Sequence, residues 1–425
     1  MISSFYNDKL VRTGSLLFIT SMVSNVFNYA FQIVMGRMLI PQEYGLMNAL
    51  FSLLSILSVP VAPLFTVVAR KTSEYKAKED FRSIGSLYRK FSNKVLLFGI
   101  SGLIIFSLGA PYIRDYLHAP STIPILILGI AIVTTFAQPL NMAVLQGVQN
   151  YKWIGINQGL GGPAKLLFTV MLVLAGFSVN GVMAGMVLTG LLLWSLSYWP
   201  LRNYTSPVAA YESAIQHISF REVVPVFLAL FAFAILTQAD MVLVRRYFSA
   251  HEAGLYASAA ILGKAVMYLP GAIVIAMFPM VSGQHALNQS SRHVLVKSLA
   301  ITVSLSGAGA ALFLLFPGWI MGILYGTRYA AACEVLKYYG IAMLPMALLM
   351  VLMNYLIARK QTLFSYLMII GALLEILAIY FYHQSLLQVV VIMLIIGTLL
   401  CIASIALQYI PIVQRQPDSP EGQVQ

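Results

Sequence analysis

Apolar runs long enough to cross a lipid bilayer follow one another along nearly the whole chain, and this pattern limits the fold more than any motif does. A helix needs about 20 predominantly apolar residues to span a bilayer. Of the 425 residues, 60% are hydrophobic and only 9% are charged, whereas a soluble domain carries about 25% charged residues. The sequence therefore predicts an all-α integral membrane protein and leaves no room for a soluble catalytic or nucleic-acid-binding domain. The net charge of +12, which in a soluble protein would suggest binding to nucleic acid, is explained in a membrane protein by basic cytoplasmic loops.

About twelve spans are predicted, six in each half of the chain. The spans of the first half cover residues 14–36, 45–69, 94–116, 122–145, 153–177 and 180–201. The spans of the second half cover residues 223–247, 254–282, 296–316, 333–358, 362–382 and 386–410. We therefore expect four parts: an N-terminal six-helix bundle (1–202), a cytoplasmic connector (203–222), a C-terminal six-helix bundle (223–411) and a polar, proline-broken tail predicted to be disordered (412–425).

The basic residues indicate how the chain lies in the membrane. An even number of spans places both termini on one side. Of the 26 Lys and Arg residues, 18 then lie on the side of the termini and five lie on the opposite side. Cytoplasmic loops carry the excess of Lys and Arg. The sequence therefore predicts a multi-pass protein of the inner or plasma membrane with both termini in the cytoplasm.

One connector occurs twice in the chain. Residues 36–46 align with residues 245–255 at an offset of 209, with the same Arg, Glu, Gly and Leu in both segments. Each segment joins the first and second spans of its half. Two six-span halves enter the membrane in the same sense, and such parallel repeats enclose a central cavity in transporters. The alternative is that Glu-x-Gly-Leu only begins two interfacial turns.

Two lysines lie too deep in predicted spans to reach the lipid headgroups easily. They are Lys165 in the fifth span and Lys264 in the eighth. Because a charge at bilayer depth costs roughly 2.5–3.5 kcal/mol, such residues usually face a cavity or a partner. We expect both to be cavity cations that bind a phosphate or diphosphate group of a substrate. The alternative is that each lysine pairs with an acid, Lys264 with Asp240 for example.

Two deep acids are candidates for coupling transport to H⁺ or Na⁺. Glu375 stands alone in the eleventh span, where it is either a buried neutral acid or a coupling group. Asp240 lies near the outer end of the seventh span, close enough in sequence to pair with Arg245 and Arg246. No other cofactor is expected.

Other polar residues are candidates for a cavity wall or a gate. They are Arg37, Arg246, Asn28, Gln32, Gln138, Asn141 and Asn157. For the arginines the alternative is a side chain that reaches the headgroups, and for the amides it is hydrogen bonding between helices. The Gly-Gly-Pro at 161–163 predicts a break or a kink in the fifth span.

Local motifs of catalysis and metal binding are missing from the sequence. No phosphate-binding loop, His-Glu-x-x-His or Gly-x-Ser-x-Gly is present, and Cys333 and Cys401 lie apart in apolar stretches. We therefore expect no catalytic residues, no metal site and no enzymatic activity.

The whole pattern resembles a known family. It consists of two six-span halves, the connector Gly36-Arg-x-Leu-x-Pro-x-Glu-Tyr-Gly-Leu46, and the segment Gln238-Ala-Asp-x-x-Leu-Val-x-x-Tyr-Phe-Ser-x-x-Glu-Ala-Gly-Leu-Tyr256. The chain resembles the polysaccharide-export branch, the Wzx-like oligosaccharide flippases, of the multidrug/oligosaccharidyl-lipid/polysaccharide (MOP) flippase superfamily.

The resemblance implies a fold and a function. The fold is a MATE-like, V-shaped pair of bundles. The function is alternating-access transfer of a polyprenyl-diphosphate-linked oligosaccharide to the outer leaflet, for surface polysaccharide, with membrane lipids, a glycan polymerase and export machinery as partners. In this family cationic side chains are expected in the cavity for the diphosphate, and Lys165 and Lys264 fit by type and depth. An ion-coupled exporter of small amphiphilic drugs or metabolites is the alternative.

Overall fold

The computed structural model describes residues 9–202, 204, 220–287, 289–359 and 361–408, and these residues form helices and no strands. The helices of the first half are α2 (Lys9–Met38), α3 (Pro41–Ser58), α4 (Val61–Ala77), α5 (Phe81–Tyr116), α6 (Ile123–Gly147), α7 (Tyr151–Leu172), η1 (Val173–Phe177), α8 (Ser178–Tyr198) and η2 (Trp199–Leu201). Those of the second half are α9 (Phe220–Tyr247), α10 (Ala250–Tyr268), α11 (Gly271–Ala286), α12 (Arg292–Leu315), α13 (Pro317–Leu324), η3 (Thr327–Ala332), α14 (Cys333–Ala358), α15 (Leu363–Phe381) and α16 (Leu386–Leu407).

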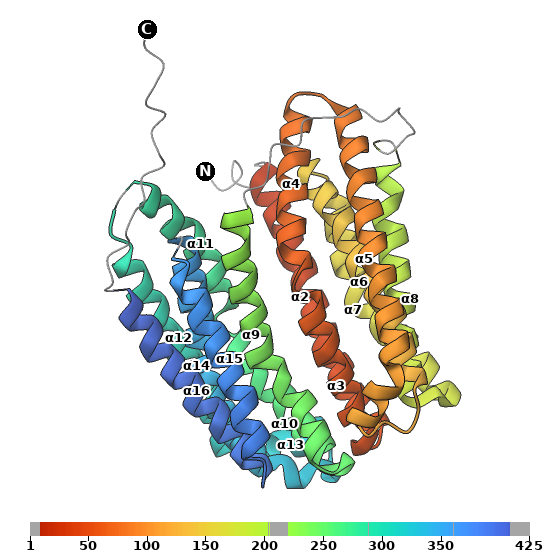
Figure 1. Cartoon of the computed structure of the whole chain (residues 1–425), viewed down its shortest axis with the longest axis vertical. Helices are drawn as coiled ribbons and strands as arrows, with labels where there is room; N and C mark the ends of the chain where they lie inside the picture. The colour runs from red at the N-terminus through yellow and green to blue at the C-terminus, as the bar shows by residue number, and fades with distance from the viewer. Residues whose placement is uncertain (1–8, 203, 205–219, 288, 360, 409–425) are drawn as a thin grey trace.

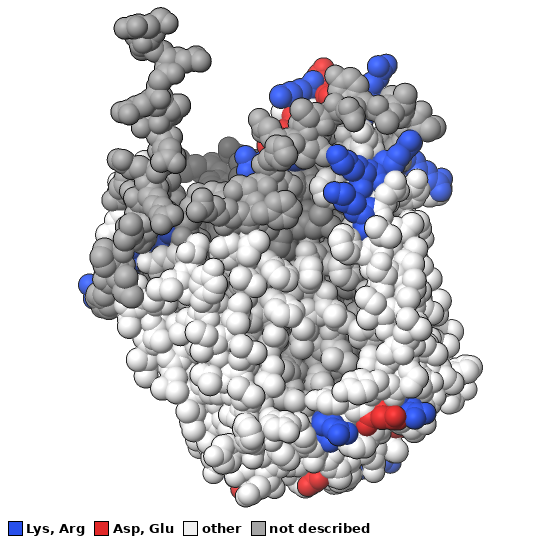
Figure 2. Space-filling model, in the orientation of Figure 1, with Lys and Arg blue, Asp and Glu red and all other residues white. Residues whose placement is uncertain are grey.

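The helices have the length and surface of membrane spans. Among the described residues, ten helical segments are long and apolar enough to cross a membrane, and one of them, Tyr151–Leu201, contains both α7 and α8. Figure 2 shows a broad belt without charged side chains between charged groups at the two ends of the molecule. The predicted all-helical membrane fold of about twelve spans is confirmed.

The second crossing of each half is broken, which the predicted spans 45–69 and 254–282 did not foresee. The first half breaks between α3 and α4 at Pro60, and the second breaks between α10 and α11 at Pro270. Proline lacks the N–H that a continuous helix requires and clashes with the preceding turn. The helices α3 and α10 also begin 209 residues apart, at Pro41 and Ala250, so the internal repeat is visible in the fold.

The two copies of the repeated connector meet at one end of the molecule. Helix α3 packs across the molecule against α9 and α10, near the bottom of Figure 1, whereas α4 and α11 lie toward the opposite end. A Cβ on Gly45 would lie 2.8 Å from the backbone nitrogen of Gly254, and a Cβ on Gly254 would overlap the Pro41 carbonyl. Glycine at both positions therefore lets the two backbones touch. We call this end the closed end.

The predicted break at residues 161–163 is wrong, because α7 runs without interruption from Tyr151 to Leu172 through Pro163. The glycines serve close packing instead: a Cβ on Gly162 would lie 2.7 Å from the Phe27 side chain of α2. Gly185 of α8 lies in the same way against Thr169 of α7. The predicted tail 412–425 and nearly all of the connector 203–222 lie outside the described residues.

Candidate functional site

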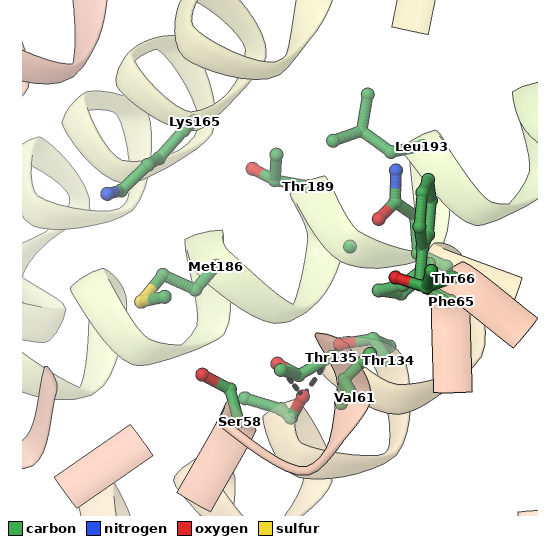
Figure 3. Close-up of a pocket in the computed structure, with 14 residues that line it drawn as sticks. Ser58, Val61, Phe65, Thr66, Thr134, Thr135, Lys165, Met186, Thr189 and Leu193 are labelled. Carbon is green, nitrogen blue, oxygen red and sulfur yellow. Dashed lines mark hydrogen bonds between the residues drawn. The ribbon is translucent and has the colours of Figure 1, made fainter. Parts of the chain in front are cut away.

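A cavity of about 680 Å³ lies within the first half, between α3, α4, α6, α7 and α8 (Figure 3). Its size falls in the range of about 300–1,000 Å³ typical of small-ligand sites. It is lined by Ser58, Val61, Phe65, Thr66, Ala131, Thr134, Thr135, Gln138, Pro139, Lys165, Met186, Thr189, Gly190 and Leu193. Apart from the Lys165 ammonium, hydroxyl and amide groups supply its polar side-chain atoms.

Lys165 is the charged residue of the cavity wall. The cavity that it lines lies within the first half, whereas the sequence placed the cavity cations in a central cavity between the two halves. Its ammonium lies 4.0 Å from the centre of the Phe31 ring and 5.2 Å from that of Phe51. The negative faces of aromatic rings attract a cation without neutralising it. Among the residues that the structure describes, no carboxylate forms an ion pair with Lys165. The cavity therefore contains a half-buried positive charge available to an anion.

Lys264 has a different environment, although the sequence gave both lysines one role. Its Nζ lies 3.5 Å from Asp240 Oδ1 and 3.4 Å from Gln238 Oε1. Asp240 is fully buried, and its Oδ2 accepts hydrogen bonds from Tyr256 (3.0 Å) and Tyr339 (2.7 Å). The alternative of an acid partner is therefore the arrangement found for Lys264. The expected pairing of Asp240 with Arg245 or Arg246 is wrong.

Glu375 completes this group of charges in the second half. It is 1% exposed, and neither carboxylate oxygen has a hydrogen-bond partner among the described residues. We call Asp240, Lys264 and Glu375 the charge cluster. Ser52 of α3 donates a hydrogen bond of 3.0 Å to the same Gln238 oxygen that Lys264 contacts. The charge cluster is thus linked to the helix that joins the two halves.

The candidate amides divide between the cavity and helix packing. Asn141 and Asn157 are buried and form hydrogen bonds between helices, which is the alternative given for the amides. Asn141 accepts a hydrogen bond from Tyr88 and donates one to Ser197. Asn157 donates a hydrogen bond to the Leu193 carbonyl. Gln138 lines the cavity. Asn28 is half-buried on α2 and is not a lining residue.

The remaining candidates lie at the closed end. Gln32 accepts a hydrogen bond of 3.2 Å from Tyr44, which also bonds Tyr325 of the second half. Arg37 donates to the Leu324 carbonyl at 2.9 Å, also across the two halves. Arg246 lies over the Tyr116 ring, 5.1 Å from its centre. Arg37 and Arg246 connect the two halves directly, whereas Gln32 bonds Tyr44 within the first half and reaches the second half only through the Tyr44–Tyr325 contact.

Arg245, which the sequence named only as a possible partner of Asp240, is the most deeply embedded charge at the closed end, with 3% exposure. It donates to the carbonyls of Leu117 (2.9 Å), His118 (3.2 Å) and Gln42 (3.2 Å), all in the first half. Its signal in the sequence was its place at the start of the repeated segment 245–255. The aromatic partners Phe31, Phe51, Tyr256 and Tyr339 carried no signal, because tyrosine and phenylalanine are common throughout the chain.

The sequence of this chain matches a known protein family. A family model described as polysaccharide biosynthesis protein matches residues 34–334. Among curated proteins, none matches the chain in sequence.

Several solved transporters share the fold. An inward-facing multidrug resistance MATE family transporter of the MOP superfamily superimposes with a TM-score of 0.76 at 11% identity, over 92% of this chain and 96% of that chain. The lipid II flippase MurJ, in an inward closed conformation, gives a TM-score of 0.67 at 14% identity over 93% and 88%. A MOP superfamily transporter from Pyrococcus furiosus gives 0.60 at 12% identity over 93% and 94%. The expected MATE-like fold is therefore confirmed.

Proposed function

We infer the function from the family: the chain belongs to the polysaccharide biosynthesis protein family whose model matches residues 34–334. We propose that it is a flippase that moves a polyprenyl-diphosphate-linked oligosaccharide from the cytoplasmic to the outer leaflet. It does so by alternating access, for the assembly or export of surface polysaccharide. A protein of the same fold, MurJ, is a lipid II flippase, which supports a lipid-linked cargo. The transfer needs no covalent chemistry.

The single observation that carries this proposal is the half-buried Lys165 in the cavity. A diphosphate must leave water to cross the bilayer, and a dehydrated anion is stabilised by a nearby cation. The ammonium of Lys165 lies over the rings of Phe31 and Phe51. Among the described residues, no acid forms an ion pair with it. The diphosphate would bind at Lys165, with the sugar nearest to it in the cavity and the polyprenyl chain in the lipid.

The positive-inside rule supports an orientation with the basic residues of segment 70–94 in the cytoplasm. Figure 2 shows Lys and Arg gathered at the end of the molecule where α4 and α5 meet. With this orientation the closed end would face outward, and the protein would be in an inward-facing state in the inner or plasma membrane. In this state Arg245 seals the outer side, and substrate enters the cavity from the cytoplasmic leaflet.

The charge cluster supports coupling to an ion gradient. With Asp240 and Glu375 both ionised, the cluster with Lys264 would carry a net negative charge, and an unbalanced buried charge is costly. One H⁺ or Na⁺ bound with Asp240 and Glu375 would make the cluster neutral. Because Gln238 joins Lys264 to Ser52 of α3, a change in this balance would reach the contact between the halves. A glycan polymerase would then take up the product.

An ion-coupled exporter of small amphiphiles was the alternative from the sequence. MATE transporters have the same fold, but the cavity here presents a lysine. A cationic drug would meet repulsion at Lys165, where an acidic wall would suit it. The cavity therefore favours an anionic cargo.

The experiment compares lipid extracts of cells with and without the gene by mass spectrometry. Deletion is expected to accumulate one polyprenyl-diphosphate glycan on the inner leaflet. The wild-type gene and Lys165→Arg should clear it, and Lys165→Ala should not. Lys297→Ala, at an exposed lysine of α12, is the matched control and should act as wild type. Unchanged lipid-linked glycans on deletion would refute the proposal.

A further inference from the structure

Four of the five hydroxyl groups of the cavity wall share one feature: each donates its hydrogen to a backbone carbonyl of its own helix. Four such bonds are present, from Ser58 to Ser55 O (2.8 Å), from Thr134 and Thr135 to Ala131 O (2.9 and 2.8 Å), and from Thr189 to Gly185 O (2.7 Å). Figure 3 shows Thr134 and Thr135 side by side in the wall. A hydroxyl that donates to the backbone keeps lone pairs to accept with. These groups therefore offer acceptors to the cavity.

Gln138 follows the same pattern for a separate reason. The Leu193 carbonyl can only accept, so Asn157 must turn its amide nitrogen toward it (2.7 Å). The Asn157 oxygen then faces Gln138, whose Nε2 donates to it at 2.7 Å. This fixes the orientation of the Gln138 amide and leaves its Oε1 oxygen to accept. The cavity wall thus combines several acceptors with the single ammonium of Lys165 among its lining residues.

We propose that this acceptor wall recognises the sugar attached to the diphosphate through hydrogens donated by the sugar's hydroxyl groups. The inference rests on the proposed function and adds the basis of its specificity. A sugar has several hydroxyl groups that can donate hydrogen bonds to these acceptors. The diphosphate joined to the sugar would then lie at Lys165. A site built to bond a ligand hydroxyl strongly rejects an analogue without it, because the buried acceptor then stays unpaired.

The wall residues lie on three elements around the lysine. Thr134, Thr135 and Gln138 come from α6, Thr189 from α8, and Ser58 from the end of α3. In Figure 3 Lys165 lies at one side of the cavity and Thr66 at the other, with Thr189 between them in the view. A diphosphate at the lysine would therefore place the attached sugar against the acceptors. The cavity volume of about 680 Å³ suits the sugar nearest the diphosphate, not a long glycan.

Binding to the purified full-length protein tests the proposal by native mass spectrometry. The probes are polyprenyl diphosphate, polyprenyl-diphosphate glucose, and the analogues in which fluorine replaces one ring hydroxyl at a time. Fluorine is similar in size and cannot donate. The glucose-bearing lipid should bind more tightly than the bare one. Fluorination of at least one position should weaken binding about fivefold, the effect of one net hydrogen bond.

Protein variants assign the effect to the wall. Thr135→Val removes the acceptor at nearly constant shape, so it should abolish the difference between hydroxyl and fluorine at one position, and Thr135→Ser should restore it. Thr398→Val is the matched control, because Thr398 makes the same bond to its own helix (2.7 Å) on an exposed face of α16. It should change nothing.

The outcomes separate this inference from the proposed function. Equal binding of all glucose and fluoro lipids to the wild type, with binding of bare polyprenyl diphosphate still dependent on Lys165, would overturn the acceptor wall and leave the flippase standing. If bare polyprenyl diphosphate binding does not change in Lys165→Ala, the proposed function fails and the inference with it.

Discussion

The pair formed by Lys264 and Asp240 should make the protein strongly dependent on both partners. Lys264 is 5% exposed and Asp240 is fully buried, with 3.5 Å between Nζ and Oδ1. Removing one partner of a buried pair costs about 3–5 kcal/mol, because the other charge stays buried. In Lys264→Met, Asp240 keeps its hydrogen bonds from Tyr256 and Tyr339. We therefore expect the lower end of that range, about 3 kcal/mol.

A double variant isolates the pair. Lys264→Met with Asp240→Asn removes both charges and keeps the shape of the acid, so the double variant should recover about 2 kcal/mol or more relative to the sum of the two single variants. Melting temperature of the purified protein is the assay. The entropy of unfolding is about 2.1 cal/mol/K per residue, so for the whole chain of 425 residues 3 kcal/mol corresponds to a fall of about 3 °C.

Lys297→Met is the control for this series, since Lys297 is exposed on α12, and it should melt as the wild type does. Two results would refute the reasoning. One is a Lys264→Met protein that melts at the wild-type temperature. The other is a double variant as unstable as the two single effects added together.

Three further predictions concern the ends of the helices. Arg245→Met should raise the share of outward-open molecules about tenfold or more, because hydrogen bonds from a charged donor contribute about 1.5–3 kcal/mol. Lys297→Met, at an exposed residue of α12, is the control, spin-label distances across the closed end are the measurement, and an unchanged distribution would contradict this role of Arg245. Gly254→Ala should lower the melting temperature where Gly14→Ala, which has open space around its Cβ, does not, and equal melting would contradict the close backbone contact. Asp80→Ala should cost about 1 kcal/mol at the start of α5, seen by hydrogen exchange. Hydrogen bonds from Ser83 lower the pKa of Asp80. The carboxylate therefore stabilises the helix above about pH 4, and this contribution is lost as the pH falls through the lowered pKa. If Asp80→Ala reduces hydrogen-exchange protection equally at pH 3 and pH 7, the carboxylate is not the cap.

Much of the fold was predictable because lipid imposes a simple pattern on the sequence. Every span needs a long apolar run, so about twelve crossings could be read directly. The repeat at 36–46 and 245–255 indicated two halves, and the structure brings Gly45 and Gly254 into contact. The breaks at Pro60 and Pro270 were missed, since apolar residues continue through both prolines and the length of the run gave no sign of them.

The sequence by itself determined that the protein lies in a membrane, that one connector occurs twice at an offset of 209 residues, and that Lys165 and Lys264 are too deep to be ordinary surface charges. Only the tertiary structure decided that the two lysines differ. Lys264 lies across from Asp240, whereas Lys165 lies against Phe31 and Phe51 in a cavity. The physical reason is that depth follows from position along one helix, while the partner of a charge depends on which neighbouring helix faces it. The same limit explains Arg245, whose acceptors are backbone carbonyls that belong to no motif.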